Sequence, residues 1–227
     1  MQQFDGVAFD LEGPIVNTEP LRFRAQREAA RAAGVELTLQ LALERVPSLI
    51  GGAISNRARE IWALSDGRIL PEEIERLETE YFERALENAD LKIRAGFPAV
   101  LKKFRDAGLR VSIGTSAVPW LAHLYIERTG LTALFEPQEI VIGDEMGCRH
   151  KPYPDVPFET ARVMGIKPTR QLVFEDSVAG ILAAIAAHSS VIAIPTVRDD
   201  QFTLKLLAAG ARLVVFEWAE LDVSSII

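Results

Sequence analysis

Side chains that can do chemistry follow four short apolar runs of this chain. The set contains Asp10, Glu12, Thr115, Ser116, Lys151, Glu175 and Asp176. Each fragment alone is weak evidence, because an acidic pair after a strand is more often a helix cap and a Lys-Pro pair is common. The ordered recurrence of all four fragments is far more specific, and it predicts one site that is assembled from distant parts of the chain.

The acidic members of this set predict a metal site. If the carboxylates of Asp10, Glu175 and Asp176 converge, they repel one another unless a hard cation lies among them. Mg²⁺ favours a few carboxylates together with water and phosphate oxygens. We therefore expect Mg²⁺ as the cofactor. The alternative is that the pair Glu175–Asp176 only caps the helix that begins near Val178.

Short apolar runs must supply the strands that position these residues. Each run is rich in Val, Ile and Phe, is too short for a helix and is apolar on both faces, which is typical of buried parallel strands. The runs are Val7–Phe9, Leu109–Ile113, Ile140–Ile142, Leu172–Phe174, Val191–Ile194 and Leu213–Phe216.

Helical patterns separate most of these runs, and several of them end at a glycine that can adopt the left-handed cap conformation. The expected helices are Phe97–Ala107, Pro119–Thr129, Asp155–Met164, Val178–Ala187 and Phe202–Ala209. Strands that alternate with helices predict an α/β fold with a doubly wound, Rossmann-like parallel sheet, whose ligand site lies at the carboxyl ends of the strands.

One region breaks the alternation, because residues 16–90 show helical patterns only. A helix begins at Pro71, and Ile74, Leu77, Tyr81 and Ala85 are expected to form its apolar stripe. We therefore predict two domains: a catalytic core of residues 1–15 and 91–227, and an inserted small helical cap of residues 16–90. A fixed helical layer on the sheet is the alternative to a mobile cap.

The four fragments together resemble the haloacid dehalogenase (HAD) superfamily, in the branch with a small helical cap that includes β-phosphoglucomutase and phosphoglycolate phosphatase. The segments FDLEGPIVNTEP, SIGTSA, CRHKPYPD and VFEDSVAGILAA are similar to the four motifs of that superfamily in order. The resemblance extends from Phe4 to about Pro195, and the helical insertion lies where the family has its cap.

The resemblance implies a role for each motif residue. Asp10 is the nucleophile that becomes transiently phosphorylated, which divides one difficult displacement into two easier ones. Thr115, Ser116 and Lys151 surround the phosphoryl oxygens with donors and positive charge. The metal set is Asp10, Glu12, Glu175 and Asp176, with Glu12 contributing its backbone carbonyl. The implied activity is a Mg²⁺-dependent phosphatase of a small phosphorylated metabolite.

Glu12 departs from the family pattern, because the residue two positions after the nucleophile is typically an Asp that acts as the general acid/base. Glu has a similar pKa, but its extra methylene displaces the carboxyl group by about 1 Å, an error that can cost roughly a hundredfold in rate. Glu12 therefore indicates either an acid/base fitted to another substrate or a degenerate member with little turnover.

The same residues also bear on other reactions of this superfamily. The alternative that the chain is a sugar-phosphate mutase resembling β-phosphoglucomutase remains open. Dehalogenation is disfavoured by Glu12 and by the pair Glu175–Asp176, and phosphonate cleavage is disfavoured because residues 15–90 contain no lysine for a Schiff base. Arg57, like Arg45, is a candidate for gripping a carboxylate or second phosphate of the substrate, although a solvated helix arginine is the commoner case.

Composition limits the class of protein. The chain of 227 residues has 25 basic and 32 acidic residues, and its net charge of −7 without a basic run argues against nucleic acid as a partner. The single Cys148 cannot form an internal disulfide, and neither a secretory signal nor an apolar stretch of about 20 residues is found. We expect a cytoplasmic protein that does not bind membranes. The sequence does not indicate the oligomeric state.

Overall fold

The computed structural model describes residues 3–226 of the chain. The chain divides into two compact units, one formed by Met1–Asn17 with Leu91–Ile227 and the other by Thr18–Asp90. We call them the sheet unit and the helical unit. The helical unit begins later than the expected residue 16, because Val16 forms bridges with Glu12 and Ile93 of the sheet unit.

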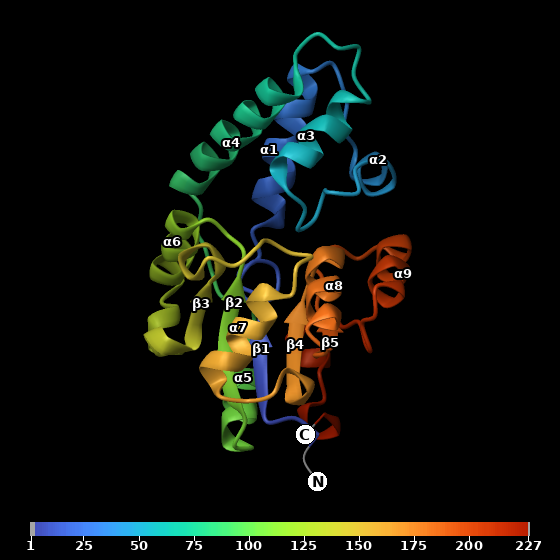
Figure 1. The fold of residues 1–227 in the computed structure, drawn as a ribbon. Helices are drawn as coiled ribbons and strands as arrows, with labels where there is room; N and C mark the ends of the chain where they lie inside the picture. The colour runs from blue at the N-terminus through green and yellow to red at the C-terminus, as the bar shows by residue number, and fades with distance from the viewer. Residues whose placement is uncertain (1–2, 227) are drawn as a thin grey trace. The chain divides into compact units, whose positions relative to one another are not determined.

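The described strands of the sheet unit form one parallel sheet in the order β3-β2-β1-β4-β5 (Figure 1). Their bounds are Gly6–Phe9 for β1, Arg110–Thr115 for β2, Ile140–Ile142 for β3, Gln171–Glu175 for β4 and Ser190–Ala193 for β5. In the register, Phe9 of β1 is paired with Ile113 of β2 and with Phe174 of β4. The carboxyl ends of these three neighbouring strands therefore lie side by side. The predicted doubly wound parallel sheet is confirmed.

The expected sixth strand, Leu213–Phe216, is wrong as a strand. Only Val214 forms an isolated parallel bridge, which pairs it with Ala193. The segment then leaves the sheet, because the backbone N–H of Phe216 donates to the Glu220 carboxylate at 2.7 Å and is not available for a ladder.

Helices cover both faces of the sheet. They are α5 (Phe97–Asp106), α6 (Pro119–Thr129), α7 (Asp155–Met164), α8 (Val178–Ala186) and α9 (Asp200–Ala208). Helices α7 and α8 contact the strands on one face, and α5 lies on the other face, behind the sheet in Figure 1. The Phe9 ring packs there against Phe97 and Phe104 of α5 and stacks on Phe174. This aromatic core is built around Phe9, the residue that precedes Asp10.

The helical unit consists of α1 (Glu19–Ala32), α2 (Leu39–Arg45), α3 (Ile54–Trp62) and α4 (Pro71–Glu87). Helix α4 packs against both α1 and α3. Its fully buried residues are Ile74, Glu78, Phe82 and Leu86, while the expected stripe residues Leu77, Tyr81 and Ala85 are half-buried beside them. The buried face includes a glutamate, which periodicity of apolar residues cannot detect.

Among the described residues, no helix combines the length and the apolar character that crossing a membrane requires.

Candidate active site

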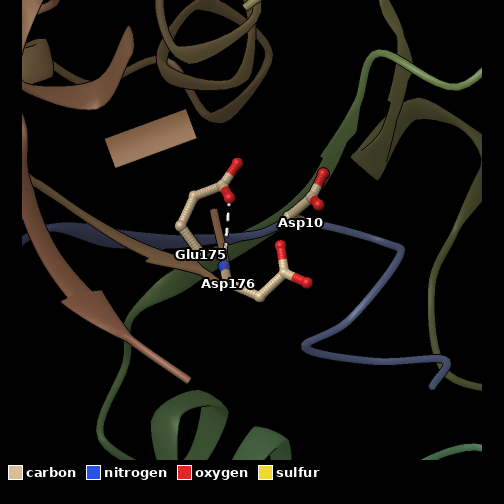
Figure 2. Close-up of side chains that lie close together, drawn as sticks. All are labelled: Asp10, Glu175 and Asp176. Carbon is tan, nitrogen blue, oxygen red and sulfur yellow. Dashed lines mark hydrogen bonds between the residues drawn. The ribbon is translucent and has the colours of Figure 1, made fainter. Parts of the chain in front are cut away.

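Three acidic side chains converge at the carboxyl edge of the sheet (Figure 2). Asp10 follows β1, Glu175 ends β4, and Asp176 comes next. Each offers a carboxylate oxygen, and these oxygens all lie within 4.8 Å of one another. All three residues are buried, with at most 7% of the surface of any of them exposed. Such a buried excess of negative charge calls for a compensating cation.

Two glycines make room for this cluster. A Cβ atom at Gly13 would lie 1.9 Å from Oδ2 of Asp176, and the residue has a φ of +84°. A Cβ atom at Gly180, in the first turn of α8, would lie 2.0 Å from the Glu175 carboxyl group. Any side chain at either position would push a carboxylate out of the cluster, so both glycines are part of the site.

Glu175 has its acceptor positions filled by neighbouring donors. Its Oε2 accepts from the backbone N–H of Asp176 at 3.0 Å, from the backbone N–H of Ser177 at 3.3 Å and from the Ser177 hydroxyl at 3.1 Å. Its Oε1 accepts from Lys151. Asp10 and Asp176 are therefore better suited than Glu175 to direct contact with a cation. The predicted N-cap exists as well, but Ser177 provides it, through a bond from Gly180 N at 3.0 Å.

Lys151 lies among these carboxylates. Its Nζ is 2.7 Å from Oδ1 of Asp10, and its side chain is only 11% exposed. Burial by itself lowers the pKa of Lys151, but the carboxylates of Asp10 and Glu175 more than offset this effect and hold the pKa above its ordinary value. Lys151 is therefore a fixed positive charge beside Asp10.

Asp10 is affected in the opposite sense. The pKa of Asp10 is raised to about 7: burial is the main cause, Lys151 opposes the rise, and the nearby carboxylates of Glu175 and Glu12 add to it. Because a nucleophilic carboxylate must be ionised, a cation beside Asp10 would favour the reactive form. The three carboxylates suit a hard cation for two reasons: the cluster is negatively charged, and all the ligand atoms that it offers are oxygens.

Two hydroxyl groups lie at the same edge, because Thr115 ends β2 and Ser116 follows it. The Thr115 hydroxyl oxygen accepts from the backbone N–H of Ala117 at 3.0 Å, which leaves its own O–H as a donor. Ser116 Oγ is buried and has no hydrogen-bond partner among the described residues. A buried hydroxyl of this kind costs free energy unless a ligand or water meets it.

Glu12 is partly buried, and its carboxylate oxygen Oε1 accepts from the Tyr125 hydroxyl at 3.0 Å. Tyr125 is fully buried in α6. Glu12 is absent from the three-carboxylate cluster of Asp10, Glu175 and Asp176. The structure thus separates the Glu12 carboxyl group from the side chains best arranged to hold a cation.

Arg57 is accounted for by contacts inside the helical unit. It is 3% exposed and forms an ion pair with the equally buried Glu78, with Nη2 at 2.5 Å from Oε1. Its Nη1 donates to the carbonyls of Ser48 at 3.0 Å and Gly52 at 3.1 Å. These contacts argue against the candidate role of Arg57 as a substrate contact, because its guanidinium already binds a carboxylate and two carbonyls, and its burial shows that it is not a solvated helix arginine either. Arg45 is exposed at the end of α2.

Sequence reasoning missed three contributors to the site. Gly180 could have been found, since a glycine in the first turn of a helix is unfavourable without a packing reason. Tyr125 gives no local signal, because its contact with Glu12 joins residues far apart in the chain. Arg94 is the third, and its Nη1 donates to the Gly13 carbonyl at 2.9 Å.

Comparisons with known proteins match this chain to a family of hydrolases and to named phosphatases. A family model described as a haloacid dehalogenase-like hydrolase matches residues 4–188. The chain is 32% identical to hexitol phosphatase A of Escherichia coli over 198 residues, which cover 86% of this chain and 84% of that protein. It is 29% identical to the fructose-1-phosphate phosphatase YqaB of the same organism, over 82% of this chain and 94% of that protein.

A solved structure is similar over nearly the whole chain. It is a HAD family hydrolase from Deinococcus radiodurans with bound phosphate and sodium. The TM-score is 0.78 at 26% identity, and the match covers 99% of this chain and 96% of the other.

Proposed function

Because the chain belongs to the haloacid dehalogenase-like hydrolases, we propose that it is a Mg²⁺-dependent phosphatase that works through a phosphorylated Asp10. The observation that carries the proposal is the convergence of Asp10, Asp176 and Lys151 at one edge of the sheet. A nucleophilic carboxylate, a fixed positive charge and a cation site are the parts that phosphoryl transfer requires.

For the substrate we propose a phosphorylated sugar or sugar alcohol. Relatives that match most of this chain are named as phosphatases of hexitol phosphates and of fructose 1-phosphate. The charge of the cluster supports a phosphate ester in general, and the choice of a polyol leaving group rests on these relatives.

In the first step, a carboxylate oxygen of Asp10 attacks phosphorus and the ester P–O bond breaks. Glu12 gives its proton to the departing oxygen, so the product leaves as an alcohol. Lys151, Thr115 and Ser116 bind the phosphoryl oxygens, on which charge is spread in the transition state.

In the second step, Glu12 takes a proton from a water molecule whose oxygen attacks phosphorus. The bond to Asp10 breaks, phosphate leaves, and Glu12 again carries the proton that the next cycle needs. Mg²⁺, when bound, neutralises charge on the phosphoryl oxygens. Asp10, Asp176 and the backbone carbonyl of Glu12 would hold it, while Glu175 is occupied by Lys151 and the backbone donors.

The helical unit is proposed to act as the cap that admits the leaving group. Its support is topological, since the insertion between Asn17 and Leu91 begins shortly after the loop that carries Glu12. If it closes as a lid, hydrogen exchange at residues 91–96 slows when Mg²⁺ and a phosphate mimic are bound. Unchanged exchange there would favour a fixed layer.

The test is a panel of hexose phosphates, hexitol phosphates, phosphoglycolate and nucleoside monophosphates, assayed for released phosphate with Mg²⁺ and with chelator. We expect release from polyol phosphates only with Mg²⁺, and none from an Asp10→Asn variant. Interconversion of hexose phosphates without phosphate release would establish the mutase alternative. No turnover of any compound would establish a degenerate member.

A further inference from the structure

The loop after β1, residues 11–16, is held by side chains from two distant segments of the sheet unit. Nη1 of Arg94 donates to the Gly13 carbonyl at 2.9 Å, and the backbone N–H of Arg94 donates to the Ile15 carbonyl at 2.8 Å. The indole Nε1–H of Trp218 donates to the Pro14 carbonyl at 2.8 Å. Three consecutive carbonyls of this loop thus have donors from Arg94 or Trp218.

Both donors are themselves firmly anchored. The Arg94 guanidinium also donates to the Ile194 carbonyl at 3.0 Å, just after β5, and to the Phe216 carbonyl. Its bonds to carbonyls are charge-assisted and therefore stronger than bonds between neutral groups. Trp218 is 1% exposed, and its ring packs on Phe9, the residue that precedes Asp10.

The loop matters because Glu12 lies within it. The Glu12 carboxylate is held from the other side by the Tyr125 hydroxyl at 3.0 Å, so its backbone must also be fixed if the carboxyl group is to have one position. Gly13, the next residue, is in contact with Asp176, and a Cβ at Gly13 would lie 1.9 Å from Oδ2 of that residue. A shift of this loop would displace Glu12, whose backbone is part of it.

We propose that Arg94 and Trp218 act as a positioning clamp, which fixes the loop after β1 and so places the Glu12 carboxyl group for proton transfer. The inference rests on the proposed function, in which Glu12 is the acid/base. Neither residue touches the reacting atoms. Their effect passes through the backbone carbonyls of Gly13, Pro14 and Ile15.

The first test uses Arg94→Met and Trp218→Phe, which keep bulk and remove donors. We expect kcat to fall about 10- to 100-fold, because a displacement of about 1 Å in a catalytic group costs up to that factor, with little change in KM. Arg94→Lys retains one charged donor and should recover part of the loss. Arg110→Met is the matched control. Arg110 also donates to two carbonyls, those of Met164 and Gly165, but it lies at the amino end of β2, away from the site.

The second test separates positioning from a structural effect by combining Arg94→Met with Glu12→Gln. If the clamp acts through Glu12, the Arg94 change costs little further activity once the acid/base is gone. Hydrogen exchange at the Gly13 and Val16 amides should also speed up in Arg94→Met and not in Arg110→Met.

Additive losses of activity in the double variant, or unchanged exchange at Gly13 and Val16, overturn the clamp while the proposed function stands. An Arg110→Met variant as impaired as Arg94→Met would do the same, because the loss would then be general destabilisation. If the wild-type protein releases no phosphate from any compound, or if Glu12→Gln is fully active, the role of Glu12 fails and the inference fails with it.

Discussion

A buried cation meets buried carboxylates in each of the two units, but the charge balance differs. In the helical unit, Arg57 faces one carboxylate, that of Glu78, and its remaining contacts are backbone carbonyls. In the sheet unit, Lys151 faces Asp10 and Glu175, and Asp176 belongs to the same cluster. The first set is neutral and complete within the protein, whereas the second carries excess negative charge.

This difference in charge supports different roles for the two sets of residues. A neutral, fully hydrogen-bonded pair fixes the packing of helices and has no remaining affinity for a ligand. A cluster with more carboxylates than cations is stable in the buried state only with a further positive charge. Burial and the neighbouring carboxylates accordingly raise the pKa of Asp10 to about 7 although Lys151 opposes the rise. Variants of the two sets can therefore separate a buried cluster for which we propose phosphoryl transfer from a buried pair that holds helices together.

The largest effect is expected from Asp10→Asn. The amide has nearly the same shape as the carboxylate but cannot form the acyl phosphate, so kcat should fall by more than about a thousandfold, as expected when a covalent nucleophile is removed. Phosphate release measures the loss, and circular dichroism should show an intact fold. Turnover within tenfold of wild type would exclude Asp10 as the nucleophile.

The next effect concerns the cation. Chelation should abolish activity, and Mg²⁺ should restore it. Mg²⁺ should also raise the thermal unfolding temperature of the wild type, since a ligand at about a hundred times its Kd adds about 2.7 kcal/mol to the free energy of unfolding. Asp176→Ala should lose most of this rise. Asp155→Ala is the control, because Asp155 pairs with Arg149 outside the cluster. Full activity in chelator would rule out the metal.

A somewhat smaller loss is expected at Glu12. Glu12→Gln removes proton transfer and should lower kcat by about 10²- to 10⁴-fold on the best substrate. Glu12→Asp should also lose activity, because the shorter side chain cannot both contact the Tyr125 hydroxyl and reach the leaving oxygen. A gain in rate for Glu12→Asp would instead indicate a decayed site. A fully active Glu12→Gln would remove Glu12 from the mechanism.

The parts of this molecule that the sequence predicts are those that local pattern controls. Buried strands are short apolar runs, and the residues that follow them lie at one edge of a parallel sheet, so the convergence of Asp10, Glu175 and Asp176 is predictable from order alone. Helices α6 and α7 have the expected bounds because a proline or an acidic residue begins each of them and a glycine ends it.

The parts that could not be predicted depend on tertiary contacts. The buried face of α4 includes Glu78, whose charge predicts an exposed side chain, and its burial makes sense only once Arg57 is opposite it. The contact of Tyr125 with Glu12 joins residues 113 positions apart and has no local signature. The segment Leu213–Phe216 has the apolar pattern of a strand, but the backbone N–H of Phe216 donates to the Glu220 carboxylate and not to a neighbouring strand.

The smallest effect on catalysis is expected at the neutral pair of the helical unit, and it completes the contrast. Arg57→Met alone leaves Glu78 buried without a partner and should cost about 3–5 kcal/mol of unfolding free energy. Arg57→Met combined with Glu78→Leu removes both charges and should recover most of that loss. The double variant should remain about 1–2 kcal/mol less stable than wild type, because the Ser48 and Gly52 carbonyls lose their donor. Urea denaturation measures both values, and kcat/KM of the double variant should equal that of wild type. A tenfold rise in KM in a stably folded double variant would instead indicate that Arg57 contacts the substrate. The charge balance of a buried cluster would then not distinguish a structural cluster from a catalytic one in this protein.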